Sequence, residues 1–420
     1  MRSQSSMWLA LALITAALLP MSATAADVQE FVVTDLDPSA TASPSIPTSA
    51  ESAESGDQVS QVDLQIEDSF DSFAEISDGT AIEICSDGDC PTPSVLESSG
   101  LFQILRDNRS ASWTGRVDSL ILWRNSPRTR PIFSQWTSTV PPDGGIVGPT
   151  VLNADQLEST PAAGPRFSLF RDNGCGHILE ATYFRAFNFR SQRALPPTDA
   201  GYTIQPYGIY GNTWANLDSG SVNLGSSIQS LEINGREKIR DNISFLFGIR
   251  WVEWQESISI QDQLRDPFDP TGPPVDDFYN TGCTNSLYGG QIGVDVALLI
   301  LKRLRVDGLV KAGAYANNAV QNSAYQYQTS GDSPFFTNSI RSNTVAGAFV
   351  GEVGINGTIP LTNRLDFTFG YLGVWLESIA QPTQQLGSQV LTQLPPPAGA
   401  ITTTGGAVVQ GLSLGLQGRW

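Results

Sequence analysis

Polar and apolar residues alternate with a period of two in ten segments between residues 115 and 420. Near the C-terminus, Leu412, Leu414 and Leu416 share one face, opposite Ser413. This period predicts β-strands. Most of the segments are longer than the five or six residues that are typical of soluble strands and reach the about 9–11 residues that cross a bilayer. They are Gly115–Trp123, Arg166–Arg171, His177–Phe189, Ser227–Lys238, Ile243–Ser257, Ser286–Ile300, Arg303–Ala316, Asn343–Ile359, Arg364–Ser378 and Gly406–Trp420.

The connections between these segments alternate between tight turns and long polar stretches. Asp172–Gly174 and Arg240–Asn242 are tight, whereas Ile260–Thr281, Asn317–Ser342 and Gln381–Thr404 are long. This alternation is typical of a transmembrane β-barrel, with tight turns in the periplasm and long loops outside. We therefore predict an all-β protein, a closed antiparallel transmembrane barrel of about ten strands. Eight or twelve strands remain alternatives, and so does a secreted soluble β-protein.

The N-terminal quarter of the sequence contains a signal for export, followed by a segment that is too polar to form a hydrophobic core. A basic start, the apolar run Trp8–Leu19 and the small residues Ala23–Ala25 indicate a signal peptide over residues 1–25. Residues 26–112 carry a net charge of −16 and few apolar residues, so we expect a largely disordered acidic tail or linker in the periplasm. The barrel is expected to occupy residues 113–420.

Composition excludes several classes of function. The acidic net charge of −18 argues against nucleic-acid binding, which needs a basic face. A single histidine disfavours histidine-based metal sites and catalysis, so we expect no enzyme, no cofactor and no metal. Export permits a disulfide between Cys85 and Cys90, which stand five residues apart in the tail.

Several stretches resemble the planctomycete outer-membrane β-barrel proteins, a family largely without assigned function. Their order and spacing match over roughly residues 115–420, and the acidic tail is not covered. The resemblance implies an outer-membrane barrel and does not supply a substrate. The matching stretches are LILWR at Leu120–Arg124, GHILEATYF at Gly176–Phe184, FLFGIRWVEWQE at Phe245–Glu256, LYGGQIGVDV at Leu287–Val296, VDGLVKAGAYAN at Val306–Asn317, the run Ala348–Ala380 and the terminal GLSLGLQGRW.

With the apolar face on lipid, the opposite face points into the lumen and carries charges of both signs. These charges could form an ion-selective constriction, or ion pairs that fill a small barrel. For ten strands the filled interior is favoured. The expected lumen-facing residues are Asp118, Glu180, Glu232, Arg236, Arg250, Asp295, Arg305, Asp307, Lys311, Glu352 and Asp366.

The last strand ends on an aromatic residue, as outer-membrane barrels commonly do. By resemblance to such barrels, Leu412, Leu414, Leu416 and Trp420 are expected to act as the insertion signal. The expected partners are therefore outer-membrane lipid and the barrel-insertion machinery, with the oligomeric state left open. Two functions remain: a narrow pore for small solutes, or a structural or adhesive surface protein with a plugged barrel and functional long loops.

Overall fold

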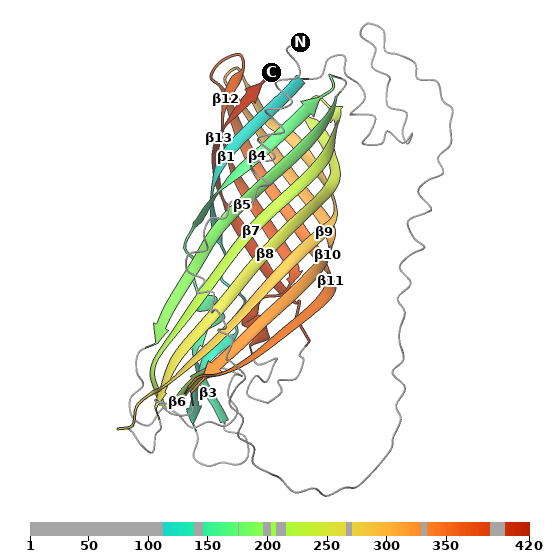
Figure 1. Ribbon diagram of the computed structural model, residues 1–420. Helices are drawn as coiled ribbons and strands as arrows, with labels where there is room; N and C mark the ends of the chain where they lie inside the picture. The colour runs from blue at the N-terminus through green and yellow to red at the C-terminus, as the bar shows by residue number, and fades with distance from the viewer. Residues whose placement is uncertain are drawn as a thin grey trace, which may run out of the picture. The chain divides into compact units, whose positions relative to one another are not determined.

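Ten antiparallel strands close into a ring in the computed structural model, which describes residues 112–137, 146–174, 176–195, 203–206, 216–265, 271–328, 334–386 and 400–420 (Figure 1). The expected count of ten strands is confirmed. The signal peptide, the acidic segment and the Cys85–Cys90 pair lie outside the described residues. In chain order the ring contains β1 (Ser112–Arg124), β4 (Ala162–Asp172), β5 (His177–Leu195), β7 (Asn216–Arg240), β8 (Ile243–Arg265), β9 (Val275–Leu301), β10 (Leu304–Tyr327), β11 (Phe336–Pro360), β12 (Leu365–Ile379) and β13 (Gly405–Arg419).

The first and last strands of the barrel close the ring. β1 pairs with β13 along its whole length, from Thr114 opposite Arg419 to Arg124 opposite Val409. At the end of this pair the backbone N–H of Trp420 donates to the oxygen of Trp113, 3.0 Å away. Closure gives every strand of the ring a hydrogen-bonded neighbour on both edges, which a sheet within a bilayer requires.

Four tight turns, which join β4 to β5, β7 to β8, β9 to β10 and β11 to β12, lie at the same end as this closing pair. The backbone N–H of Arg419 donates to the oxygen of Arg364, in the β11–β12 turn, at 2.9 Å. Figure 1 shows the end of β13 and the start of β1 together at this end, which we call the turn end. An even number of strands produces this arrangement.

The wall of the barrel is taller on one side. Strands β7 to β11 contain 23–27 residues each, whereas β1, β4, β12 and β13 contain 11–15. The prediction of long loops at Ile260–Thr281 and Asn317–Ser342 was therefore wrong in part, because β8 to β11 continue into them. Beyond the membrane the outward face of these strands meets water and not lipid, so its residues are polar. The alternation of polar and apolar residues therefore ends there, while the strands stay hydrogen-bonded to one another.

An apolar belt circles the outside of the barrel near the turn end. On β8 the outward residues are apolar up to Trp251 and polar from Glu253 onwards. Large apolar side chains stand exposed on this belt, such as Ile249 at 65% and Ile292 at 59%. Exposure of so many large apolar side chains on a closed ring is the pattern of a lipid-facing surface.

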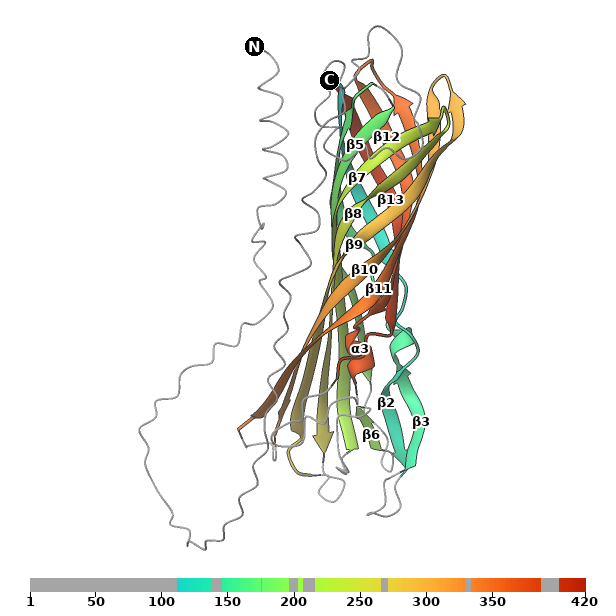
Figure 2. The same cartoon turned by 90° about the vertical axis from the view of Figure 1, so that its right-hand side faces the viewer.

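A second, smaller sheet lies at the other end, which we call the outer end. β2 (Pro131–Thr137), β3 (Ile146–Asn153) and β6 (Thr203–Pro206) form this outer sheet in the order β3-β2-β6. The short helices η2 (Ala154–Gln156) and α3 (Pro382–Gln385) accompany it, and Figure 2 shows α3 and the outer sheet at the end opposite the C-terminus. Among the described residues no helix is long and apolar enough to cross a membrane.

Candidate functional site

The lumen of the barrel is the candidate site, and its layer nearest the turn end is built from ion pairs. Asp118 on β1 accepts from two guanidinium groups, those of Arg116 and Arg166, each at 2.8 Å. Thr368 on β12 donates its hydroxyl to the same carboxylate at 3.0 Å. The Asp118 side chain is fully buried, so these three donors replace the water that an ionised carboxylate needs.

The centre of this layer is a four-charge cluster, made by Glu232 on β7, Arg250 on β8, Lys311 on β10 and Glu352 on β11. Arg250 Nη1 lies 2.7 Å from Glu352 Oε2, and Lys311 Nζ lies 2.5 Å from Glu232 Oε1 and 3.2 Å from Glu352 Oε1. All four side chains are at most 8% exposed. Gln291 adds a bond from its amide to Glu232 at 2.7 Å. Alternating charges therefore compensate one another across the lumen.

The other predicted charges pair at the rim of the same layer. Arg236 bridges Glu180, at 2.6 Å, and Asp295. Arg305 and Asp307 pair with each other at 2.8 Å, close to the β9–β10 turn, where the Arg305 side chain is 57% exposed. Asp366 accepts from Arg419 at 2.8 Å. The structure thus places all eleven predicted residues in ion pairs.

Sequence reasoning missed three cations of this network. Arg116, Arg166 and Arg419 occupy inward positions of β1, β4 and β13, as the residues that they contact show. Arg116 stands two residues before Asp118, so the alternation that placed Asp118 in the lumen could also have placed Arg116 there. With these three, the ion pairs of this layer join seven carboxylates to seven cations among the described residues, and the layer is neutral.

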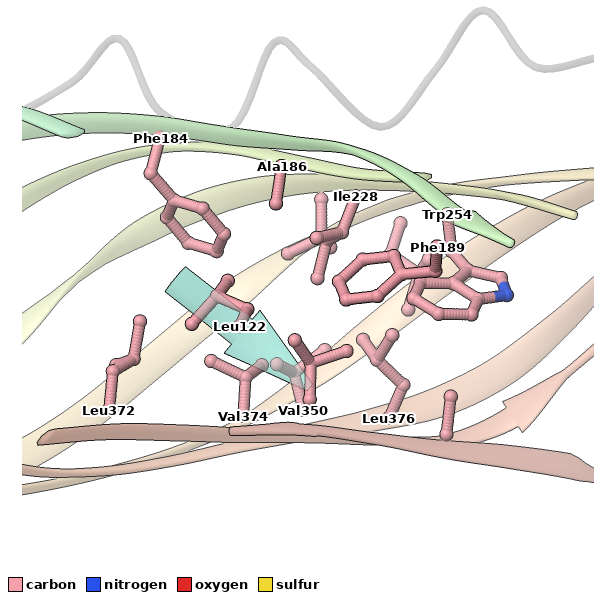
Figure 3. Close-up of a cluster of buried hydrophobic side chains, with 14 of the residues drawn as sticks. Leu122, Phe184, Ala186, Phe189, Ile228, Trp254, Val350, Leu372, Val374 and Leu376 are labelled. Atoms are coloured by element: carbon pink, nitrogen blue, oxygen red, sulfur yellow. The ribbon is translucent and has the colours of Figure 1, made fainter. Parts of the chain in front are cut away.

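Next to the ion pairs lies a layer of apolar side chains, which we call the lumen seal. Figure 3 shows Phe184, Ala186 and Ile228 on one wall pointing toward Leu372, Val374 and Leu376 on the other, with Leu122 between them. Leu120, Trp254 and Val350 also belong to this layer, and every member is at most 5% exposed. Apolar contact across the full width of the lumen leaves these side chains no water-filled space. The expectation of an interior filled by charges alone was therefore incomplete.

Beyond the seal, the chain that follows β12 folds into the lumen. We call this segment, Ser378 to Leu386, the strap. Ser378 has a left-handed backbone with φ of 63°, which few residues other than glycine adopt, and it turns the chain inward. The side chains of Ile379, Gln381, Gln385 and Leu386 are fully buried.

A pair of amide side chains on the barrel wall holds the strap. Asn285 on β9 donates to the Ala380 oxygen at 2.8 Å and accepts from the Ala380 N–H at 2.7 Å. Asn317 on β10 donates to the Ser378 oxygen at 3.2 Å and to Asn285 Oδ1 at 3.0 Å. The Asn285 amide therefore satisfies both backbone groups of Ala380, as a neighbouring strand would.

The outer sheet covers the lumen beyond the strap. Ile132, Phe133 and Leu152 of this sheet are buried against Ile258 and Ile260, which are inward residues of the tall wall. Arg130, just before β2, donates from its guanidinium to the oxygen of Leu386 and so joins the outer sheet to the strap. Ion pairs, seal, strap and outer sheet are thus stacked along one lumen.

The residues predicted as an insertion signal lie on the outer face of β13. Leu412, Leu414, Leu416 and Trp420 are each about half exposed there, within the apolar belt. In the folded barrel the strand pairs with β12 on one edge and β1 on the other. Their role in insertion stays a prediction.

The matching family covers most of the chain. The model described as "Putative beta barrel porin-7 (BBP7)" matches residues 113–420. The chain belongs to this family. The family description names a β-barrel porin without stating a solute, and the planctomycete source that the resemblance implied stays a prediction.

Solved structures share with the BBP7 chain only a distant likeness. A FadL homologue of Pseudomonas aeruginosa is 9% identical, with 74% of this chain and 90% of that chain covered, at a TM-score of 0.26. The toluene transporter TodX of P. putida has the same identity and coverage at a TM-score of 0.29. The toluene transporter TbuX of Ralstonia pickettii is 10% identical, with 76% and 94% covered, at 0.26. Among curated proteins none matches the chain. Likeness at this level carries no argument about transport.

Proposed function

We propose that this BBP7 member is an outer-membrane protein whose barrel is closed to solutes and serves as a membrane anchor for its outer end. The observation that carries this proposal is the lumen seal, because its side chains meet from opposite walls and are at most 5% exposed. A water-filled pore would leave inward residues at this level solvated.

In this proposal the outer end of the barrel is the part that the membrane anchor holds at the cell surface. β7 to β11 continue beyond the apolar belt, with outward residues such as Gln255, Ser257 and Gln261 that suit water. The outer sheet packs on the inner side of the same wall. We place the turn end in the periplasm and the outer end at the cell surface, since tight turns face the periplasm in outer-membrane barrels. No catalytic role is part of the proposal.

A narrow pore is the second candidate, and the family description as a porin favours it. In that function the strap and the seal would have to move out of the lumen. The left-handed residue Ser378 marks the hinge at which the strap would turn, and the Asn285 amide is the contact that would have to break.

Conductance of the refolded barrel in a planar lipid bilayer separates the two functions. We expect no single-channel steps from the wild type. An open porin refolded in the same way is the positive control and should conduct. Steady steps from the wild type would contradict the closed anchor and support the pore.

A further inference from the structure

An open apolar groove of about 470 Å³ runs across the outer face of β9, β10 and β11, inside the apolar belt. Gly308 has no side chain to fill the groove, and a Cβ atom at this position would lie 3.0 Å from Leu298 Cδ1. The phenol of Tyr371 at its edge donates to Gln410, at 2.7 Å, so the groove itself offers no free hydroxyl. Its walls are Val294, Val296, Leu298, Val310, Val353 and Ile355.

The groove leads toward the β9–β10 turn. Leu298 precedes Lys302 by four residues, a distance of about 13 Å along a strand. Half of a hydrocarbon core is about 15 Å thick, so the groove and the turn lie within one leaflet. A molecule with an apolar chain in the groove would therefore have its polar end at this turn.

The turn carries two adjacent cations that are exposed and unpaired. Lys302 and Arg303 form no ion pair with an acidic side chain in the part of the chain that the structure describes. The neighbouring Arg305 is already paired with Asp307. At the β7–β8 turn, by contrast, Asp241 neutralises Lys238 at 3.0 Å, which leaves Arg240 as a single exposed cation. The β9–β10 turn therefore places two cations without an acidic partner at the membrane boundary, where they can bind an anion.

We propose that the groove and the β9–β10 turn together bind an anionic phospholipid, with one acyl chain in the groove and the phosphate on Lys302 and Arg303. The occupant has to be apolar within the belt and anionic at its edge, and a phospholipid combines both properties. A second copy of this chain fits less well, because its described turns bring Arg240 and Arg364, which are also exposed cations.

The test uses the refolded barrel in phosphatidylcholine vesicles that contain spin-labelled phosphatidylglycerol or spin-labelled phosphatidylcholine. Electron paramagnetic resonance measures the fraction of each lipid that the protein immobilises. We expect the wild type to prefer phosphatidylglycerol. Lys302→Gln with Arg303→Gln should lower that preference at least about fivefold, because each basic residue near an anionic headgroup changes affinity by about that factor.

Three further variants separate the site from a general effect of charge. Gly308→Leu fills the groove, and Ile355→Trp fills it from an exposed wall if the first variant folds poorly; either should release the immobilised phosphatidylglycerol. Arg240→Gln, at the β7–β8 turn, should leave the preference unchanged. An unchanged preference in the double glutamine variant or in the filled groove would overturn the proposal. An equal loss with Arg240→Gln, or a dimer in place of immobilised lipid, would overturn it as well.

Discussion

Removing one cation from the four-charge cluster tests whether the lumen is dry. Lys311→Met deletes the ammonium that lies 2.5 Å from Glu232 and 3.2 Å from Glu352. Arg250 is then left to compensate two buried carboxylates, and it lies 3.9 Å from Glu232. Breaking a buried pair in this way costs about 3–5 kcal/mol, whereas an exposed pair contributes about 0–1 kcal/mol. If the lumen is dry, Lys311→Met should therefore lower the free energy of unfolding by about 3–5 kcal/mol.

A second substitution shows that the loss is electrostatic. Lys311→Met with Glu232→Gln restores neutrality, so the double variant should recover about 1–3 kcal/mol of the loss. The assay is guanidinium unfolding of the barrel in lipid vesicles, followed by tryptophan fluorescence, with the shift of the midpoint read at constant slope. Lys238→Met, which removes the exposed pair with Asp241, is the matched control and should stay within about 1 kcal/mol of the wild type. A Lys311→Met variant as stable as this control would refute a dry, paired interior.

Three other predictions concern the faces, the orientation and the assembly of the barrel. Phe369→Arg, in the middle of the outward residues of β12, should lower stability by about 2–4 kcal/mol, whereas Phe369→Leu should not; an arginine without effect would mean that this face meets water. A protease site inserted near Gly331 should be cut on intact cells and one in the acidic segment should not; the reverse pattern would invert the orientation. Deleting Gly418–Trp420 should reduce heat-modifiable barrel in the outer membrane without reducing export, and unchanged levels would remove the insertion role.

The ring of the barrel could be predicted because a single physical rule repeats along it. Strands that separate lipid from the lumen alternate, so Ile243–Ser257 was visible as a strand and β8 begins at the same residue. The rule weakens where the strand leaves the membrane, so the sequence pattern places the last six residues of β8, from Ile260 onwards, in a loop.

The lumen seal was less visible because it is apolar on both faces of the strands. In the run Leu120–Trp123, Leu120 and Leu122 are fully buried in the lumen while Ile121 and Trp123 face outward. Such a run looks like an ordinary hydrophobic segment. Contact with lipid explains why Ile121 and Trp123 are apolar, but it does not explain Leu120 and Leu122. Its unbroken apolar character was nevertheless a signal that both sides of the wall are dry at this level.

The strap and the outer sheet could not be predicted from local pattern. The β2–β3 pair has three register shifts within seven residues, so no alternation develops. The strap is held by the amide of Asn285, which lies 95 residues away from Ala380 in the sequence. Contacts of this kind become visible only when the barrel has closed around them.

The most direct test of the sealed lumen is the reactivity of a thiol placed inside it. Val374→Cys, in a chain whose native cysteines are replaced by serine or alanine, puts the thiol on an inward position that is 1% exposed. Arg305→Cys, at the exposed rim of the same lumen, is the control for access from the turn end. With the barrel folded in vesicles, a small charged methanethiosulfonate reagent should modify Cys at position 305 rapidly and leave position 374 unmodified. Equal rates at the two positions would contradict the closed barrel.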